Sequence, residues 1–283
     1  MKKSVLIAAA IVAASAASAQ TGEITSNRGE NWLSQDGDWG LTFDAQPIFN
    51  YVGNLFNGGS NGENVMQLNG MSPSLFMGLP NHSGGNQVII GGKKLVDANT
   101  AYRGKLRIGF GSTKTTDVVD DDNPDAAADA TVEDVLKTNY MNVVLGAGLE
   151  KRVGSTRVVG VYGGELLVGF GSNKTTYEYG NPSGENTSAE RPTEIKHPSS
   201  FGLGLQAFAG IEWFFAPKMS LGGEYTWGLA MVSDGFTETT TEEYDFADET
   251  VETSTETTGP KHNRFSLDTG VSGASISLNF YFQ

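Results

Sequence analysis

Hydrophobic and polar residues alternate one by one along many segments of this chain. Over residues 102–110, one face holds Tyr, Gly, Leu, Ile and Phe, whereas the other holds Arg103, Lys105 and Arg107. Residues 274–282 alternate in the same way. Because successive side chains of a β-strand point to opposite sides, this period of two predicts strands with one apolar and one polar face.

The alternating segments are longer than the five or six residues usual in soluble sheets. A strand that crosses a membrane needs about ten residues with every second side chain apolar, because one face contacts lipid. The pattern therefore predicts a transmembrane, antiparallel, up-and-down β-barrel of eight strands rather than a soluble sandwich. The predicted strands occupy residues 38–51, 86–96, 101–113, 138–151, 157–171, 200–215, 219–232 and 265–282.

Aromatic residues lie near the ends of these predicted strands. The two interfaces of a bilayer select paired girdles of such residues, one at each rim. One rim is expected to hold Trp39, Tyr102, Trp213, Phe280 and Phe282. Phe110, Phe170 and Trp227 are expected nearer the other rim.

The connections between the predicted strands are alternately long and short. The three short ones are residues 97–100, 152–156 and 216–218, and the four long ones are roughly 52–85, 114–137, 172–199 and 233–264. Outer-membrane barrels combine short periplasmic turns with long extracellular loops. An even number of strands would put both termini in the periplasm and every long loop outside the cell.

The first nineteen residues have the pattern of a secretory signal peptide. A positive start at Lys2 and Lys3 precedes an apolar run over residues 5–14 and a small-residue site over residues 17–19. The run is too short to span a bilayer comfortably. We expect a signal peptide over 1–19, a periplasmic segment over 20–37 and an outer-membrane β-barrel over 38–283 of a Gram-negative cell.

Composition narrows the partners and the chemistry. The formal charge is −14, and it would be −16 without the leader, which carries two lysines and no acid. Such acidity argues against a nucleic-acid partner, since phosphate binding needs a basic face. With no cysteine, the chain has neither disulfides nor thiolate metal sites. The 37 glycines suit tilted, closely packed strands.

The polar faces of the predicted strands carry charges of both signs. Eight strands leave an interior just wide enough for side chains to fill, and an unpaired buried ion costs several kcal/mol. We therefore expect a salt-bridged polar plug rather than an open channel. Its expected members are Asp44, Arg103, Lys105, Arg107, Glu150, Glu165, Glu212 and Glu224, together with either Lys93 or Lys94.

The expected outer loops differ in chemistry. Two similar sequences, GFGSTKTT and GFGSNKTT, place Lys114 and Lys174 where they would reach the phosphates of outer-leaflet lipid. The loops over 114–137 and 233–264 are acidic and predict a solvated rim rather than a calcium site. The loop over 52–85 is nearly uncharged and rich in Met and Leu. It is expected to fold over the barrel mouth or to contact a partner.

Signals for an enzyme are weak. Residues 58–62 match the string G-x-S-x-G, but they lie in a glycine- and asparagine-rich loop rather than at a strand-to-helix turn. The three histidines, His82, His197 and His262, are scattered over three predicted outer loops. We expect no catalytic residue, no metal and no cofactor. A lipid-modifying barrel enzyme is the third hypothesis, after a surface-interaction protein and a small porin-like passive channel.

The alternating segments, the long outer loops, the short turns and the terminal SISLNFYF stretch resemble the small outer-membrane β-barrels of the OmpA-transmembrane-domain and OmpX type. The resemblance is architectural and covers roughly residues 38–283. It implies insertion by the barrel-assembly machinery and a structural, adhesive or evasion role at the cell surface. We expect contact with outer-membrane lipid including lipopolysaccharide, and contact of the loops with an extracellular protein or another surface partner. Two features depart from the family: the sequence has Gln283 after the last aromatic residue, and we expect no periplasmic domain after the barrel.

Overall fold

The computed structural model describes residues 24–45, 48, 90–154, 156–184 and 189–283. Within these residues every named element is a β-strand, and all the strands belong to one antiparallel sheet. The described part contains no helix long and apolar enough to cross a membrane. The strands are β1 (Trp39–Asp44), β2 (Ile90–Asp97), β3 (Thr100–Asp120), β4 (Thr131–Val153), β5 (Val158–Glu178), β6 (Arg191–Lys196), β7 (Ser200–Ala216), β8 (Met219–Asp234), β9 (Thr237–Asp245), β10 (Thr250–Thr258) and β11 (Asn263–Phe282).

Eight of the strands close into a ring by hydrogen bonding to their neighbours. The ring runs β1, β2, β3, β4, β5, β7, β8 and β11, and β11 pairs back with β1. Phe170 of β5 pairs with Phe201 of β7, so β6, which lies between these strands in the sequence, is not part of the ring. Trp39 pairs with Phe282, which joins the first strand to the last. The expected all-β, antiparallel arrangement with eight strands in sequence is thereby confirmed.

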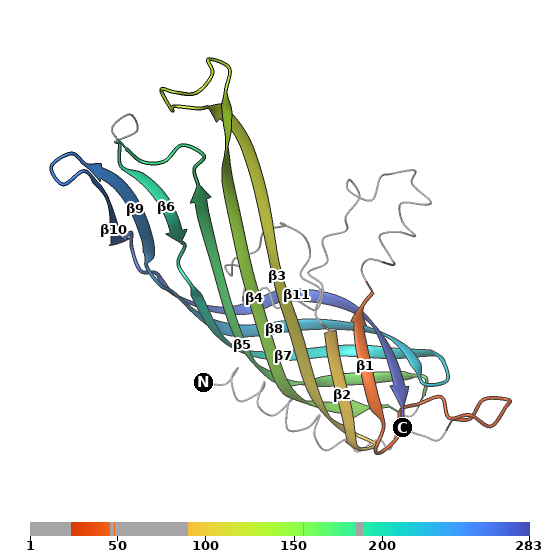
Figure 1. The fold of residues 1–283 in the computed structure, drawn as a ribbon. Coiled ribbons are helices and arrows are strands. Elements are labelled where there is room, and N and C mark those ends of the chain that lie inside the picture. The colour runs from red at the N-terminus through yellow and green to blue at the C-terminus, as the bar shows by residue number, and fades with distance from the viewer. Residues whose placement is uncertain (1–23, 46–47, 49–89, 155, 185–188) are drawn as a thin grey trace, which may run out of the picture.

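Strands β3, β4 and β5 extend beyond the ring at the end opposite the short turns (Figure 1). The expected loop over 114–137 is wrong, because β3 and β4 pair without interruption as far as Asp120 and Thr131. Only residues 121–130 connect them. The segment is rich in Thr and Val, which favour strands. Both of its faces are largely exposed, so nothing imposed the alternation that identified the other strands.

The other two outer connections that the structure describes also contain strands. The expected loop over 172–199 continues β5 to Glu178 and forms β6, and the acidic tract after β8 forms a hairpin of β9 and β10. The hairpin is not isolated, because β9 also pairs sideways with β6. The order β10-β9-β6-β5 thus makes a second sheet region outside the ring (Figure 1).

The short connections lie where the alternation placed them, with one shift. Ala98 and Asn99 link β2 to β3, and Pro217 and Lys218 link β7 to β8. The turn expected over 152–156 lies instead over residues 154–157, because β4 continues to Val153. Arg152 is therefore a strand residue, and it points into the ring, where it is 2% exposed.

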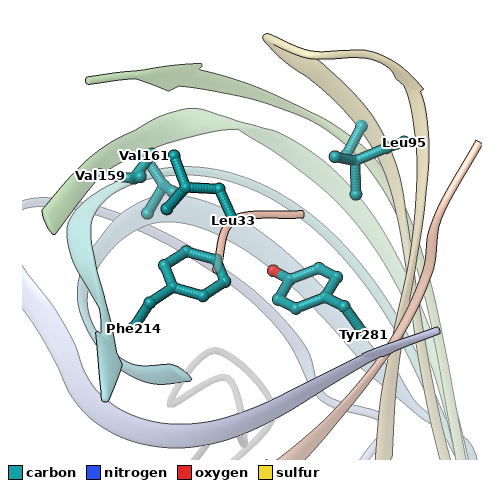
Figure 2. Packing of buried hydrophobic residues seen from close by; sticks show 7 residues of the cluster. Leu33, Leu95, Val159, Val161, Phe214 and Tyr281 are labelled. Atoms are coloured by element: carbon teal, nitrogen blue, oxygen red, sulfur yellow. The ribbon is translucent and has the colours of Figure 1, made fainter. Parts of the chain in front are cut away.

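An apolar cluster fills the ring at the end with the short turns. Figure 2 shows Val159, Val161, Phe214 and Tyr281 converging from β5, β7 and β11. Leu33 of the N-terminal segment 24–38 packs among them and is 4% exposed. Burying one leucine contributes about 2 kcal/mol, so this contact fixes the segment inside the ring.

Polar contacts fasten the same segment to the turns. The Lys218 amide donates to the Trp32 carbonyl at 3.0 Å, and the Gly37 amide donates to the Leu95 carbonyl at 3.2 Å. The Arg157 guanidinium lies 4.0 Å from the centre of the Trp32 ring. The described part of the segment expected over 20–37 therefore closes this end of the ring.

The expected signal peptide over 1–19 and the apolar loop over 52–85 lie outside the described residues, as do His82 and the G-x-S-x-G string. The expected first strand over 38–51 is described as β1, which ends at Asp44. The expected second strand over 86–96 is described from Ile90 onward and ends at Asp97.

Candidate functional site

Charged side chains fill the ring directly beyond the apolar cluster. On β2 and β3 the inward positions that follow Leu95 and Ala101 are Lys93 and Arg103, which pair across the two strands. Both are buried. The sequence pattern did not decide which of Lys93 and Lys94 points into the ring. The structure places Lys93 inside, whereas Lys94 lies 4.7 Å from the Trp39 ring on the outside.

Arg103 joins three glutamates from three other strands. Its guanidinium lies 2.7 Å from Glu224 on β8, 2.8 Å from Glu165 on β5 and 3.3 Å from Glu150 on β4. The guanidinium also stacks over the Phe208 ring at 4.0 Å. A planar group with several donors can bind several carboxylates at once, which suits arginine to this central position.

Arg152 forms a second centre between the first one and the apolar cluster. It contacts Glu150 and Glu212, in both cases at 2.5 Å. Tyr281 donates a hydrogen bond to Glu212 at 2.6 Å, as does Ser220 at 2.5 Å. Sequence reasoning missed Arg152 because it assigned this residue to a turn. Its place two residues beyond Glu150, on the same face of an alternating segment, is the signal that could have identified it.

The expected interior residues meet with two exceptions. Lys105 binds Glu165 at 2.7 Å, and Lys93 binds Glu150 at 3.0 Å. Arg107 lies on the same inner face but is only partly buried, and no salt bridge joins it to another described residue. The side chain of Asp44 lies outside what the structure describes.

Within the described residues the network is electrically balanced. Four cations, Lys93, Arg103, Lys105 and Arg152, meet four carboxylates, Glu150, Glu165, Glu212 and Glu224. All four cations are below 9% exposed. Buried charges that are paired and hydrogen-bonded fill space, and removing one partner exposes the full desolvation cost of the other. The arrangement can hold the strands in register.

The outer face of the ring is apolar, in contrast to its interior. Cross-strand neighbours on this face are repeatedly aliphatic or aromatic, for example Leu166 with Leu205 and Leu203 with Met231. These four side chains are each 39–54% exposed. Other exposed apolar residues of the ring strands are Leu41, Phe43, Ile90, Leu106, Ile108, Met141, Leu145, Leu149, Val158, Ile211, Tyr225, Phe265 and Leu267. The ring therefore has the inverse of the usual distribution, in which contiguous apolar patches are buried.

Most of the expected aromatic residues lie at the two ends of this apolar wall. Trp39, Tyr102, Trp213 and Phe282 are exposed at the end with the short turns. Phe280 lies on the same side but is partly covered by Phe43, whose ring meets it edge-on at 6.1 Å.

At the opposite end, Phe110 and Phe170 are exposed. Trp227 is not there: it pairs with Ala207, halfway along β8, and is only partly exposed. Its assignment to this rim is wrong, because Trp227 lies six positions along β8 from Ser233, which pairs with Phe201 at the rim.

The two lysines expected near the outer rim both lie beyond the apolar wall, on β3 and β5. Lys114 is exposed. Lys174 is bound to Glu194 of β6 at 2.5 Å. The hydrogen bond that Lys174 donates lowers the pKa of the Glu194 carboxyl.

Two of the three histidines and one further acidic cluster lie within the described residues. His197 shares a hydrogen bond with Thr175 at 3.2 Å, and His262 is exposed. Three carboxylates at the tip of the β9–β10 hairpin, on Asp245, Asp248 and Glu252, lie within 4.8 Å of one another. They are solvated and add to the acidic surface expected here.

No protein-family model matches the chain, and no curated protein matches it.

Proposed function

We propose that this chain spans the outer membrane of a Gram-negative cell as an eight-stranded β-barrel with a plugged interior. It acts there without catalysis, as a structural element or through contacts that its extended strands make outside the cell. The observation that carries the proposal is the inverted polarity of the ring, with ion-paired charges inside and an apolar wall outside. Lipid is the surrounding that makes such a wall stable.

The height of the wall suits a bilayer. Along β7 the outward apolar positions run from Phe201 to Trp213, with Leu203, Leu205 and Ile211 between them. Twelve steps of about 3.3 Å, tilted by about 40°, span about 30 Å, the thickness of a hydrocarbon core. Exposed aromatic side chains at both ends of this span support the same interpretation.

The plugged interior favours a structural or surface role over a passive channel. The ion network and the segment that carries Leu33 fill successive levels of the ring. Planar-bilayer recording of the refolded protein tests this part: it should show no frequent, well-defined openings. Regular single-channel steps would replace the proposal with a small porin-like channel.

Beyond the wall, β3 to β6 present polar faces of mixed charge, and β9 and β10 present acidic faces without a basic residue. These faces suit contact with an extracellular protein. The chain would reach this location with a cleaved signal peptide and insert through the barrel-assembly machinery. The pattern of residues 1–19 supports the first step, and the resemblance to small outer-membrane barrels implies the second.

Two substitutions at exposed apolar residues test the membrane assignment directly. Leu205 lies in the middle of the wall and is 52% exposed, whereas Val118 lies on the outer face of β3 beyond the wall and is 66% exposed. Leu205→Arg should cost about 2–4 kcal/mol at the bilayer midplane and reduce the heat-modifiable band in the outer-membrane fraction. Val118→Arg should leave that band unchanged. If both variants behave alike, or if the wild type shows no mobility shift on boiling, the chain does not span the membrane.

A further inference from the structure

Lysines gather on the outer face of β3 and β4 just beyond the apolar wall. Lys114 follows Phe110 by four residues on β3, and Lys137 precedes Met141 by four residues on β4. Because the two strands are antiparallel, both lysines lie on the side away from the wall. The two lysines are directly opposite each other in the antiparallel register, just as Phe110 is opposite Met141. The pairing between them continues without a bulge, so all four side chains share one face.

This lysine pair lacks a counter-charge. Both residues are exposed, and no salt bridge joins either of them to another described residue. Like charges directly opposite on neighbouring strands destabilise a sheet, since their Cβ atoms are about 5 Å apart. An anion between the two ammonium groups would relieve this repulsion.

The acids nearest in register do not supply that anion. Glu178 of β5 is opposite Val135, which is the next residue after Lys137 on the outer face of β4 in the direction away from the wall. Glu133 is one outward position further along β4, beyond Val135. Neither of these glutamates forms a salt bridge with another described residue. Lys174, by contrast, is already bound to Glu194.

The positions around the pair supply further hydrogen-bond donors. Thr176 of β5 lies opposite Lys137, and Ser112 and Asn139 form the adjacent cross-strand pair on the side toward the wall. On β3 and β4 the surface between the wall and the lysines is therefore uncharged and able to donate, and Lys174 of β5 lies beside Asn139, where it is bound to Glu194. Two ammonium groups with hydroxyl and amide neighbours match a phosphate monoester, whose oxygens only accept when it is fully ionised.

The adjoining apolar wall decides the source of the phosphate. Four residues of strand span about 13 Å, so a molecule that binds the lysines through its phosphate can lay apolar chains along Phe110, Met141 and Ile108. We infer that Lys114 and Lys137 together bind the phosphate of a phosphorylated lipid in the outer leaflet. This inference rests on the proposed membrane location, and it replaces Lys174 with Lys137 as the second lipid-binding lysine.

Binding of diphosphoryl lipid A in detergent tests the pair. The purified full chain, Lys114→Gln/Lys137→Gln, and Lys114→Arg/Lys137→Arg are each titrated with diphosphoryl lipid A, with the dephosphorylated lipid and with inorganic phosphate. Lys151→Gln is the matched control, because Lys151 is an exposed lysine on the same outer face of β4 at the opposite end of the strand. The gel shift on boiling reports whether each variant is folded.

We expect the double glutamine variant, which loses both charge-assisted contacts, to bind diphosphoryl lipid A about tenfold more weakly, a loss of about 1.4 kcal/mol. The arginine variant and Lys151→Gln should stay within about twofold of the wild type, and the dephosphorylated lipid should not distinguish the variants. Equal affinities for wild type and the glutamine variant would overturn the inference. Competition by inorganic phosphate at lipid-like concentrations would also overturn it, in favour of a free-anion site. Failure of the membrane proposal is distinct, because it removes the gel shift from the wild type itself.

Discussion

Replacing Arg103 should lower the free energy of unfolding, and a second substitution in the interior network should restore part of the loss. Arg103→Met removes one cation from the balanced set of four cations and four carboxylates. Glu150 keeps Lys93 and Arg152, at 3.0 and 2.5 Å. Glu165 keeps Lys105, at 2.7 Å. The loss therefore falls mainly on the fourth glutamate.

That fourth glutamate is Glu224, whose salt bridge within the described residues is made to Arg103 alone. Its side chain is 11% exposed, so water can compensate little for the missing cation. Leaving one buried charge without a partner costs about 3–5 kcal/mol. Removing that charge as well, in Arg103→Met/Glu224→Gln, should recover about 2 kcal/mol or more. The double variant should thus be more stable than Arg103→Met.

Urea unfolding of the protein in detergent, followed by tryptophan fluorescence, measures these differences. With a slope of about 2 kcal/mol per molar urea, a loss of 4 kcal/mol lowers the midpoint by about 2 M. Arg264→Met provides the control. Its salt bridge to Asp234 is 2.9 Å long but its side chain is 54% exposed, so the cost should be about 0–1 kcal/mol.

Two results would refute this reasoning. If Arg103→Met costs no more than Arg264→Met, the interior is hydrated and its charges need no partners. If adding Glu224→Gln lowers stability further by its full separate cost, the two side chains are not coupled, and the assignment of the orphaned charge to Glu224 is wrong.

Three further predictions follow from other parts of the structure. Gly163→Ala should abolish the heat-modifiable band, because the added methyl would lie 1.9 Å from a backbone oxygen of the neighbouring strand, whereas Gly223→Ala, with nothing within 4 Å, should keep it. Leu33→Ala should lower the free energy of unfolding by about 2–5 kcal/mol in the same urea assay, since the residue is 4% exposed in the apolar cluster; an unchanged midpoint would mean that the N-terminal segment does not close the ring. The pKa of Glu194 is lowered, so its stabilising contact is present above the ordinary glutamate range and is lost as pH falls through the lowered value. Lys174→Gln should raise that pKa toward the ordinary value in an NMR titration, and no change would show that Lys174 is not its main partner.

The sequence by itself determined the class of the fold and the two faces of its strands. Alternation is a local property, because each side chain of a strand points opposite to its neighbours wherever the strand lies. It therefore identified Arg103, Glu150 and Glu212 as inward residues and Leu205 as an outward one before any pairing was known. The balance of charges inside followed from the cost of an unpaired buried ion.

Alternation fails where both faces of a strand meet water. The extensions of β3 and β4 beyond the wall have no buried face, so their Thr, Asp and Lys residues carry no period of two, and the segment read as a loop. For the same reason the sequence could not show that Lys114 and Lys137 are opposite each other. That register depends on hydrogen bonds between strands that only the folded chain brings together.

Contacts between distant segments were decided by the tertiary structure alone. The pairing of β5 with β7, which bypasses β6, joins residues far apart in the chain, and so does the insertion of Leu33 into the cluster that contains Phe214. So does the choice of Glu212 as a partner of Arg152, sixty positions along the chain. A local pattern states which way a side chain points, but closing the ring decides which side chains it meets.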